Sequence, residues 1–413
     1  MRKLIFLALA AAAFVPATAK DLKAEIDRSH NLWWNAPEKP VVRLALTDTT
    51  GQAKEAQVRF YVTTDMMPDK VVLDRTYAVT APAQLEIAVP VPGPGFYKCH
   101  VEDDGNVIDE TWIGYEPTNV VSLPDNKPDF DEFWARAKAE LAEVPADYTM
   151  EVLPELSGEK RNVYMCTFRS LGGDTIKAWV AIPKAPGKYP AQVYYNGYGG
   201  KPWRLDPDGR PDWIEMATSV RGQYLSADGN KYGDWIRHNL DKPEEYYYKG
   251  AFMDAVRAID VLQQLPQTDA EHMYAEGGSQ GGALTLAAAA LCDGRLRAIA
   301  PYIPFLSDYK DYFRIVPWPA SSVKEAAKDL GMSDEQMYDN LTYFDIKNFA
   351  RRIECPVLMG IGLQDPTCPP HTNMSSYNLI TTPKELVIYP DCGHTVDYGD
   401  WNPRRDAFFA RWR

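Results

Sequence analysis

The pentapeptide Gly277-Gly278-Ser279-Gln280-Gly281 constrains this chain more than any other segment. It fits the pattern G-x-S-x-G, in which a serine occupies a sharp turn between a β-strand and an α-helix. Glycines suit the flanks of such a turn because side chains would collide where the backbone bends tightly. Residues 272–276 have the pattern of a short strand, and residues 282–291 that of a buried, alanine-rich helix. The alternative is an ordinary serine in a glycine-rich turn, but the strand before it and the helix after it favour a nucleophilic serine.

A serine hydroxyl is a weak nucleophile and needs a general base, which in turn needs an acid to orient it. In α/β-hydrolases the three residues occur in the order serine, acid, histidine. Asp365 follows the strand-like residues 356–361, and His394 follows the strand-like residues 385–389. Another histidine, His371, opens a helix beside the Asp365 loop. The alternatives are a turn aspartate and a solvated loop histidine, but the order in the chain favours a triad of Ser279, Asp365 and His394.

Catalysis by such a triad also needs backbone N–H donors for the negative charge that develops on the carbonyl oxygen. One donor comes from the residue after the nucleophile, which is Gln280, and the other from a loop after an early strand. Residues 196–200 read Asn-Gly-Tyr-Gly-Gly and follow a strand-like stretch at 191–195. A flexible turn is the alternative for this loop. The sequence predicts an oxyanion hole formed by Tyr198 and Gln280.

Composition and charge exclude several classes of partner. The chain has 413 residues, 45% hydrophobic and 24% charged, and a formal net charge of -13. These proportions are typical of a soluble globular protein, and the negative charge without a basic tract argues against a nucleic-acid partner or an anionic membrane surface. The six cysteines show neither a C-x-x-C pair nor the spacing of a zinc site. Cys368 and Cys392 lie near the proposed acid and base, and whether they form a disulfide stays open at this point.

The first nineteen residues have the three parts of a secretory signal peptide. Arg2 and Lys3 precede an apolar run over residues 4–14, and Ala17-Thr18-Ala19 provides a cleavage site. A buried N-terminal helix is the alternative. We expect cleavage after Ala19 and export from a bacterial cytoplasm, to the periplasm or the medium. Loss of Arg2 and Lys3 would change the net charge from -13 to -15, because two cations are removed.

The pattern of the chain changes near residue 116. Residues 20–115 contain short alternating apolar stretches separated by turn residues, and Asp104-Gly105 is typical of a tight hairpin. A small immunoglobulin-like β-sandwich is the simplest interpretation. A linker rich in Pro, Asn and Asp follows over residues 116–127. The β domain contains no evident catalytic set, so carbohydrate binding, a spacer role and an interface all stay open for it.

From residue 128 onward strand and helix signals alternate, which predicts a mostly parallel sheet with helices on both faces. A long stretch at about 305–350 reads as an inserted helical segment that could roof the site. The sequence predicts strands at 162–169, 176–182, 191–195, 217–220, 273–276, 298–303, 356–361 and 386–389. It predicts helices at 128–141, 250–264, 280–291, 322–330, 372–379 and 403–412.

These motifs together resemble the acetyl xylan esterase and cephalosporin C deacetylase family, which is carbohydrate esterase family 7. The resemblance rests on Arg221-Gly222-Gln223, on the 277–281 pentapeptide, and on Asp365 and His394, and it covers about residues 125–413. It implies an α/β-hydrolase in which Ser279 is the nucleophile, His394 the base and Asp365 its orienting acid. It further implies that Arg221 and Gln223 support the site without taking part in the chemistry.

The resemblance implies removal of acetyl groups from acetylated carbohydrates, with xylan fragments as substrate, without a metal or other cofactor. Two departures stand out. The family usually has Glu after the catalytic histidine, where this chain has Thr395. The compact members lack a β domain and form ring-like hexamers, so a homo-oligomer is possible but its form is open. The alternatives are a feruloyl or glucuronoyl esterase, a peptidase, or an inactive glycan-binding protein on a hydrolase scaffold.

Overall fold

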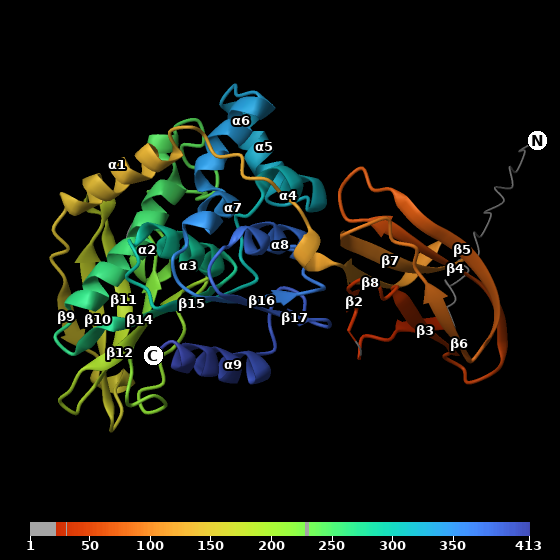
Figure 1. Cartoon of the computed structure of the whole chain (residues 1–413), viewed down its shortest axis with the longest axis horizontal. Helices are drawn as coiled ribbons and strands as arrows, with labels where there is room; N and C mark the ends of the chain where they lie inside the picture. Colours follow the sequence, from red (N-terminus) through yellow and green to blue (C-terminus); the bar gives the residue numbers. More distant parts are fainter. Residues whose placement is uncertain (1–21, 30, 228–230) are drawn as a thin grey trace, which may run out of the picture.

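The computed structural model describes residues 22–29, 31–227 and 231–413. The predicted signal peptide at residues 1–19 lies outside this part of the chain. An all-β region occupies one end of the molecule, and a larger region in which helices cover a sheet occupies the other (Figure 1). In the described ranges, no helix combines the length and apolar character needed to cross a membrane.

The all-β region consists of two sheets whose buried faces share one core. Alternation explains the strands: Val42, Leu44 and Leu46 of one strand are at most 1% exposed, whereas the residues between them face outward. The first sheet has the order β1 (Leu22–Ile26), β3 (Val41–Asp48), β6 (Ala83–Ala88). The second has the order β2 (Trp33–Trp34), β8 (Asn106–Tyr115), β7 (Gly95–Asp103), β4 (Lys54–Thr64), β5 (Val71–Ala81).

The predicted hairpin at Asp104-Gly105 is confirmed. Asp103 pairs with Asn106, so these two residues alone connect β7 to β8. Their φ angles of 47° and 75° are both left-handed, as a two-residue turn of this kind requires.

The larger region is built on one mixed sheet. Its strand order is β17 (Lys384–Tyr389), β16 (Val357–Gly362), β15 (Ala298–Tyr302), β14 (Thr268–Gly278), β12 (Tyr189–Tyr195), β13 (Ile214–Ser219), β11 (Thr175–Pro183), β10 (Arg161–Arg169), β9 (Thr149–Val152). Neighbours from β17 to β13 are parallel, whereas β11, β10 and β9 pair antiparallel. The predicted fold class, an α/β-hydrolase preceded by an all-β domain, agrees with this architecture.

Helices cover both faces of the sheet. α2 (Tyr247–Gln264) and α3 (Gln280–Leu291) lie on one face and α9 (Tyr398–Arg411) on the other (Figure 1). Every residue of α3 except Ala290 is buried, because the helix consists almost entirely of small and apolar residues. The remaining α-helices are α1 (Phe130–Ala142), α4 (Tyr309–Ile315), α5 (Ala320–Asp329), α6 (Asp334–Leu341), α7 (Ile346–Phe349) and α8 (Pro370–Leu379).

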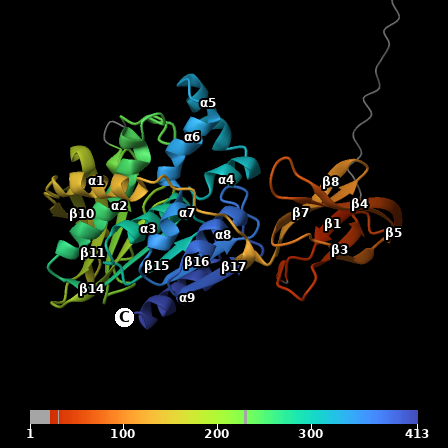
Figure 2. The same cartoon turned by 45° about the horizontal axis from the view of Figure 1, so that its top comes forward.

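The expected helical segment at 305–350 contains α4 to α7, and Figure 2 shows α4, α5 and α6 projecting together from the helical layer. Other bounds differ from the prediction. β13 begins at Ile214 and β14 at Thr268, both earlier than expected, and α9 begins at Tyr398 because Asp397 caps it by accepting a hydrogen bond from Gly399 N–H. The short edge strand β9 was not predicted.

Candidate active site

Every sequence-predicted site residue follows a strand at the carboxyl edge of the parallel part of the sheet. Tyr198 follows β12, Arg221 and Gln223 follow β13, and Ser279 follows β14. Asp365 follows β16, and His394 follows β17. Since the carboxyl ends of parallel strands meet at one edge, the topology gathers residues nearly 200 positions apart.

Ser279 lies in the sharp turn that its sequence context predicts. It separates the last residue of β14 from the first residue of α3 and has φ 57° and ψ −123°, an uncommon conformation for a residue with a side chain. The neighbouring glycines are required by space: a Cβ on Gly281 would lie 2.0 Å from the carbonyl oxygen of Tyr195, and one on Gly278 would lie 2.1 Å from the Tyr302 ring. The turn therefore holds the serine side chain at the end of the sheet.

Asp365 and His394 are directly joined. His394 Nδ1 lies 2.8 Å from Asp365 Oδ2 and 3.1 Å from Oδ1. The carboxylate is buried and also accepts the backbone N–H groups of Thr367 and Cys368, whereas the imidazole is about one-third exposed. Across the described residues, no hydrogen bond links Ser279 to His394. Contacts between nucleophile and base are often loose without substrate and tighten in the reacting complex.

The two predicted oxyanion donors lie on segments that Gln223 connects. Its side-chain oxygen accepts the N–H of Gly199, next to Tyr198, at 3.0 Å. Its amide also exchanges two hydrogen bonds with the Gln280 side chain, at 3.0 and 3.1 Å. Within the described ranges, the backbone N–H groups of Tyr198 and Gln280 have no hydrogen-bond partner in the protein. Both are therefore available to a substrate oxygen.

Arg221 is held by ion pairs with two aspartates. It forms a two-pronged ion pair with the buried Asp254 of α2, at 2.9 Å from Nε and 2.7 Å from Nη2. Its Nη1 lies 2.9 Å from Asp174. The paired carboxylates favour the charged guanidinium, and the pKa of Arg221 is raised although burial opposes this. Arg221 thus fastens the turn after β13, which also carries Gln223, to helix α2.

Aromatic rings surround Tyr198. The ring of Trp235 lies 4.9 Å from the Tyr198 ring, that of Trp318 lies 6.1 Å away, and that of Phe305 lies 6.5 Å away. Trp318 comes from the helical segment and is 46% exposed. Trp213 and the three tyrosines 246–248, by contrast, are buried core residues. Phe305 also donates its N–H to the Ser279 carbonyl oxygen at 3.0 Å.

Cys368, which the sequence places near the acid, also contacts Ser279, and the sequence did not predict that contact. Burial raises the pKa of the Cys368 thiol well above the usual range, and the negative charge of Asp365 raises this pKa further. A hydrogen bond with the Ser279 side chain lowers the pKa in part. Three atoms that can bind metals lie within 4.8 Å of one another here: a carboxylate oxygen of Asp365, Sγ of Cys368 and a ring nitrogen of His394. Such a set could hold a metal ion. Cys368 and Cys392 are both free thiols, so the disulfide considered from the sequence is not formed.

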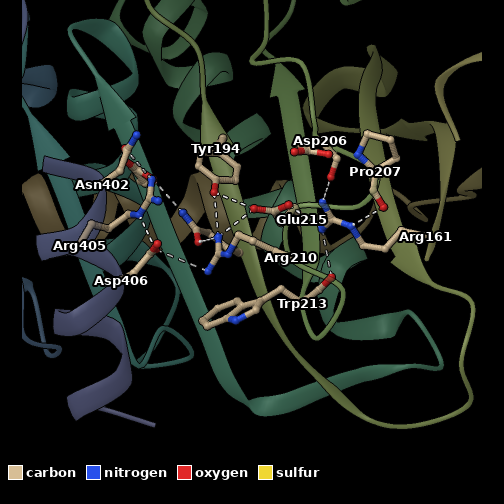
Figure 3. Close-up of polar contacts among 12 residues, drawn as sticks. Arg161, Tyr194, Asp206, Pro207, Arg210, Trp213, Glu215, Asn402, Arg405 and Asp406 are labelled. Atoms are coloured by element: carbon tan, nitrogen blue, oxygen red, sulfur yellow. Dashed lines mark hydrogen bonds and ion pairs between the residues drawn. The ribbon is translucent and has the colours of Figure 1, made fainter. Parts of the chain in front are cut away.

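A buried network of charges lies between α9 and the sheet (Figure 3). Glu215 on β13 pairs with Arg161 at 2.6 Å and with Arg210 at 2.8 Å. Glu276 on β14 pairs with Arg405 of α9 at 2.7 Å and accepts the Trp401 indole N–H at 3.0 Å. Burial raises the pKa of Glu276, and the charge of Arg405 opposes that rise. The network fixes α9 and β10 to the strands between them.

Replacement of Arg161 by methionine is expected to lower the free energy of unfolding by about 3–5 kcal/mol, the usual cost of breaking a buried ion pair. Arg161 is fully buried, and its loss would also deprive the carbonyl oxygens of Asp206, Pro207 and Trp213 of their donor. Denaturant unfolding followed by tryptophan fluorescence measures the change. Arg404→Met is the matched control, because Arg404 forms an exposed pair within α9 and its loss should cost at most about 0.5 kcal/mol. Equal losses in both variants would contradict the assigned importance of the network.

Known proteins share this architecture. Residues 119–410 match the model of the acetyl xylan esterase family. An acetyl esterase, Axe7A, from Xylanibacter ruminicola is 28% identical over 358 residues, which cover 82% of this chain and 79% of that protein. The acetyl xylan esterase from Paenibacillus sp. R4 is 31% identical, with a TM-score of 0.67 over 72% of this chain and 99% of its own. Acetyl xylan esterase 1 from a Thermoanaerobacterium species is 28% identical, with a TM-score of 0.63 over 72% and 98% of the two chains.

Proposed function

The chain belongs to the acetyl xylan esterase family, and we propose that it removes acetyl groups from acetylated xylan or xylo-oligosaccharides through an acetyl-enzyme intermediate. It is a carboxylic ester hydrolase. The observation that carries the proposed mechanism is the position of Ser279 on a strained turn, at the same sheet edge as the hydrogen-bonded pair of Asp365 and His394.

In the first half of the proposed reaction, Ser279 Oγ bonds to the acetyl carbonyl carbon while its proton passes to His394 Nε2. Asp365 holds the other ring nitrogen, Nδ1, in its protonated form, so that Nε2 is free to accept that proton. The bond between the acetyl carbon and the sugar oxygen then breaks, and His394 donates the proton to that oxygen, which leaves as a free sugar hydroxyl. In the second half, water takes the place of the serine hydroxyl: it bonds to the acetyl carbonyl carbon while its proton passes to His394. The bond to Ser279 Oγ then breaks, His394 returns the proton to Ser279, and acetate is released.

Negative charge gathers on the former carbonyl oxygen in both halves. The backbone N–H groups of Tyr198 and Gln280 are the proposed donors to it. Gln223 would fix their spacing, because its amide contacts both the Gly199 N–H and the Gln280 side chain. Arg221 would support Gln223 by anchoring their shared turn to Asp254. This assigns Arg221 and Gln223 to positioning and not to chemistry.

The substrate and location form part of the same proposal. An acetylated carbohydrate carries little charge at its ester, so the negative net charge of this chain would not oppose its binding. A polymeric substrate lies outside the cell, which agrees with export to the periplasm or the medium after removal of residues 1–19.

The first test is acyl-chain selectivity. We expect kcat/KM for p-nitrophenyl acetate to exceed that for p-nitrophenyl butyrate at least about 10-fold, because added methylene groups must fit a pocket shaped for acetyl. Acetylated xylo-oligosaccharides should release acetate, whereas methyl ferulate should be a poor substrate. Equal or better turnover of butyrate or ferulate would replace this proposal by a carboxylesterase for larger acyl groups. Glycan binding without any ester hydrolysis would favour the inactive-scaffold alternative.

A further inference from the structure

The all-β region lies against the loops that carry Asp365 and His394. In both Figure 1 and Figure 2 it is next to α8, β17 and α4 and far from β10. We call the loop that carries Asp365 the acid loop and the loop that carries His394 the base loop. The last strand of the all-β region, β8, contacts the acid loop directly: Thr111 and Trp112 both hydrogen-bond to Gln364, the residue before Asp365. The family match begins at residue 119, beyond the end of β8. This contact therefore involves a part of the chain outside the residues that the family model matches.

The Gln364 side chain uses its full hydrogen-bonding capacity. Its oxygen accepts the Trp112 N–H at 2.8 Å and the Thr111 hydroxyl at 3.1 Å. Its nitrogen donates to the Trp112 carbonyl oxygen at 3.2 Å and to the Pro390 carbonyl oxygen at 2.8 Å. An amide has two acceptor positions and two N–H donors, and all four are occupied. One side chain thus connects β8, the acid loop and the base loop that leads to His394.

The backbone reinforces the connection between the two loops. Gln364 N–H donates to the Cys392 carbonyl oxygen at 2.9 Å, two residues before His394. Gln364 is half-buried and Thr111 is 1% exposed, so water competes poorly for these hydrogen bonds. The acid and base loops are thus joined through a residue that also contacts the β domain.

A second polar contact joins the two regions just after the acid loop. His371, in the first turn of α8, has its Nδ1 2.7 Å from Asp65 Oδ2, and both side chains are less than 10% exposed. The Met67 N–H donates to the Arg314 carbonyl oxygen on α4 at 2.7 Å. A domain tethered only as a spacer would not need buried, directional contacts on both sides of the catalytic loop.

We infer that the β domain acts as a positioning element for catalysis, and that it does so through Gln364, which holds the Asp365 and His394 loops at their working separation. Gln364 is a positioning residue, because it touches neither substrate nor reacting atoms. The inference rests on the proposed function, since it assumes that Asp365 and His394 act together on Ser279. Its physical basis is that a displacement of about 1 Å in a catalytic group can cost 10²-fold in rate.

The main test replaces Gln364 by leucine, which has a similar size and no hydrogen-bonding groups. We expect kcat for p-nitrophenyl acetate to fall about 10²-fold while KM changes less than about 3-fold, because orientation of the triad is lost and substrate contacts are kept. A variant that was only less stable would keep its kcat at temperatures where it is fully folded. An unchanged kcat in folded Gln364→Leu would overturn the inference.

A second variant reaches the same contact from the β domain. Thr111→Val removes one hydroxyl donor to Gln364 and should lower kcat, whereas Thr80→Val, on the exposed face of β5, should not. In the Gln364→Leu background the Thr111→Val effect should disappear, as double-mutant coupling requires. If Gln364→Leu does not fold, the Thr111→Val result alone decides, and a kcat equal to that of Thr80→Val overturns the inference.

Failure of this inference can be distinguished from failure of the proposed function. Wild type and Ser279→Ala are assayed in parallel on the same substrate. Activity that survives in Ser279→Ala would refute the proposed mechanism itself. Activity that is lost in Ser279→Ala but unaffected by Gln364→Leu would refute only the positioning role of the β domain.

Discussion

Ser279→Ala is expected to lower kcat for p-nitrophenyl acetate by about a million-fold, the loss measured when the nucleophile of a catalytic triad is removed. The reason is that no other side chain of the site replaces the covalent step. The thiol of the adjacent Cys368 does not substitute, because burial raises its pKa well above the usual range and keeps it protonated. Steady-state release of p-nitrophenol, extended to high enzyme concentration for the variant, measures the change.

Covalent labelling separates loss of chemistry from loss of structure. A fluorophosphonate that reacts with activated serines should add one adduct to the wild-type protein and none to Ser279→Ala, as intact mass shows. Ser321→Ala, at an exposed position in α5, is the matched control and should retain both labelling and turnover. Turnover that persists at more than a thousandth of the wild-type rate would remove Ser279 as the nucleophile.

The structure shows why some parts of the fold could be predicted from sequence. The bounds of α3, residues 280–291, coincide with the prediction because the signals there are local: the turn at Ser279 ends the strand, and an alanine-rich stretch follows. The hairpin at Asp104-Gly105 was equally local. The chain order of Ser279, Asp365 and His394 could be recognised because each follows a strand signal, and parallel strands bring such positions together.

What the sequence could not provide depends on partners far along the chain. β13 begins at Ile214, but Glu215 interrupts the apolar pattern, and its partner Arg161 lies 54 positions earlier. Gln364 reads as an ordinary loop residue until Thr111, 253 positions away, is found beside it. Cys368 near Ser279 is a contact of the same kind. Buried polar pairs of this sort need three-dimensional geometry, because hydrophobic periodicity carries no information about them.

Asp365→Asn is expected to lower kcat about 10⁴-fold, the effect known for this substitution in catalytic triads. The new amide keeps the size of the carboxylate and can still accept the N–H groups of Thr367 and Cys368. Its NH₂ group would then face His394 Nδ1, which lies 2.8 Å from Asp365 Oδ2. Nδ1 must become the acceptor, so the proton moves to Nε2, and Nε2 loses the ability to take the Ser279 proton.

Kinetics at saturating p-nitrophenyl acetate test this expectation. KM should change little, because Asp365 is buried beneath the histidine and has no direct contact to offer the acetyl group. Asp391→Asn is the matched control: Asp391 is exposed on the base loop, and the substitution removes the same charge three residues from His394. If Asp365→Asn and Asp391→Asn both kept kcat within about 10-fold of wild type, the expected loss of about 10⁴-fold would be absent. Asp365 would then not be the acid of the triad. If both lost activity equally, the effect would be one of loop charge and not of histidine orientation, because only Asp365 contacts the imidazole ring.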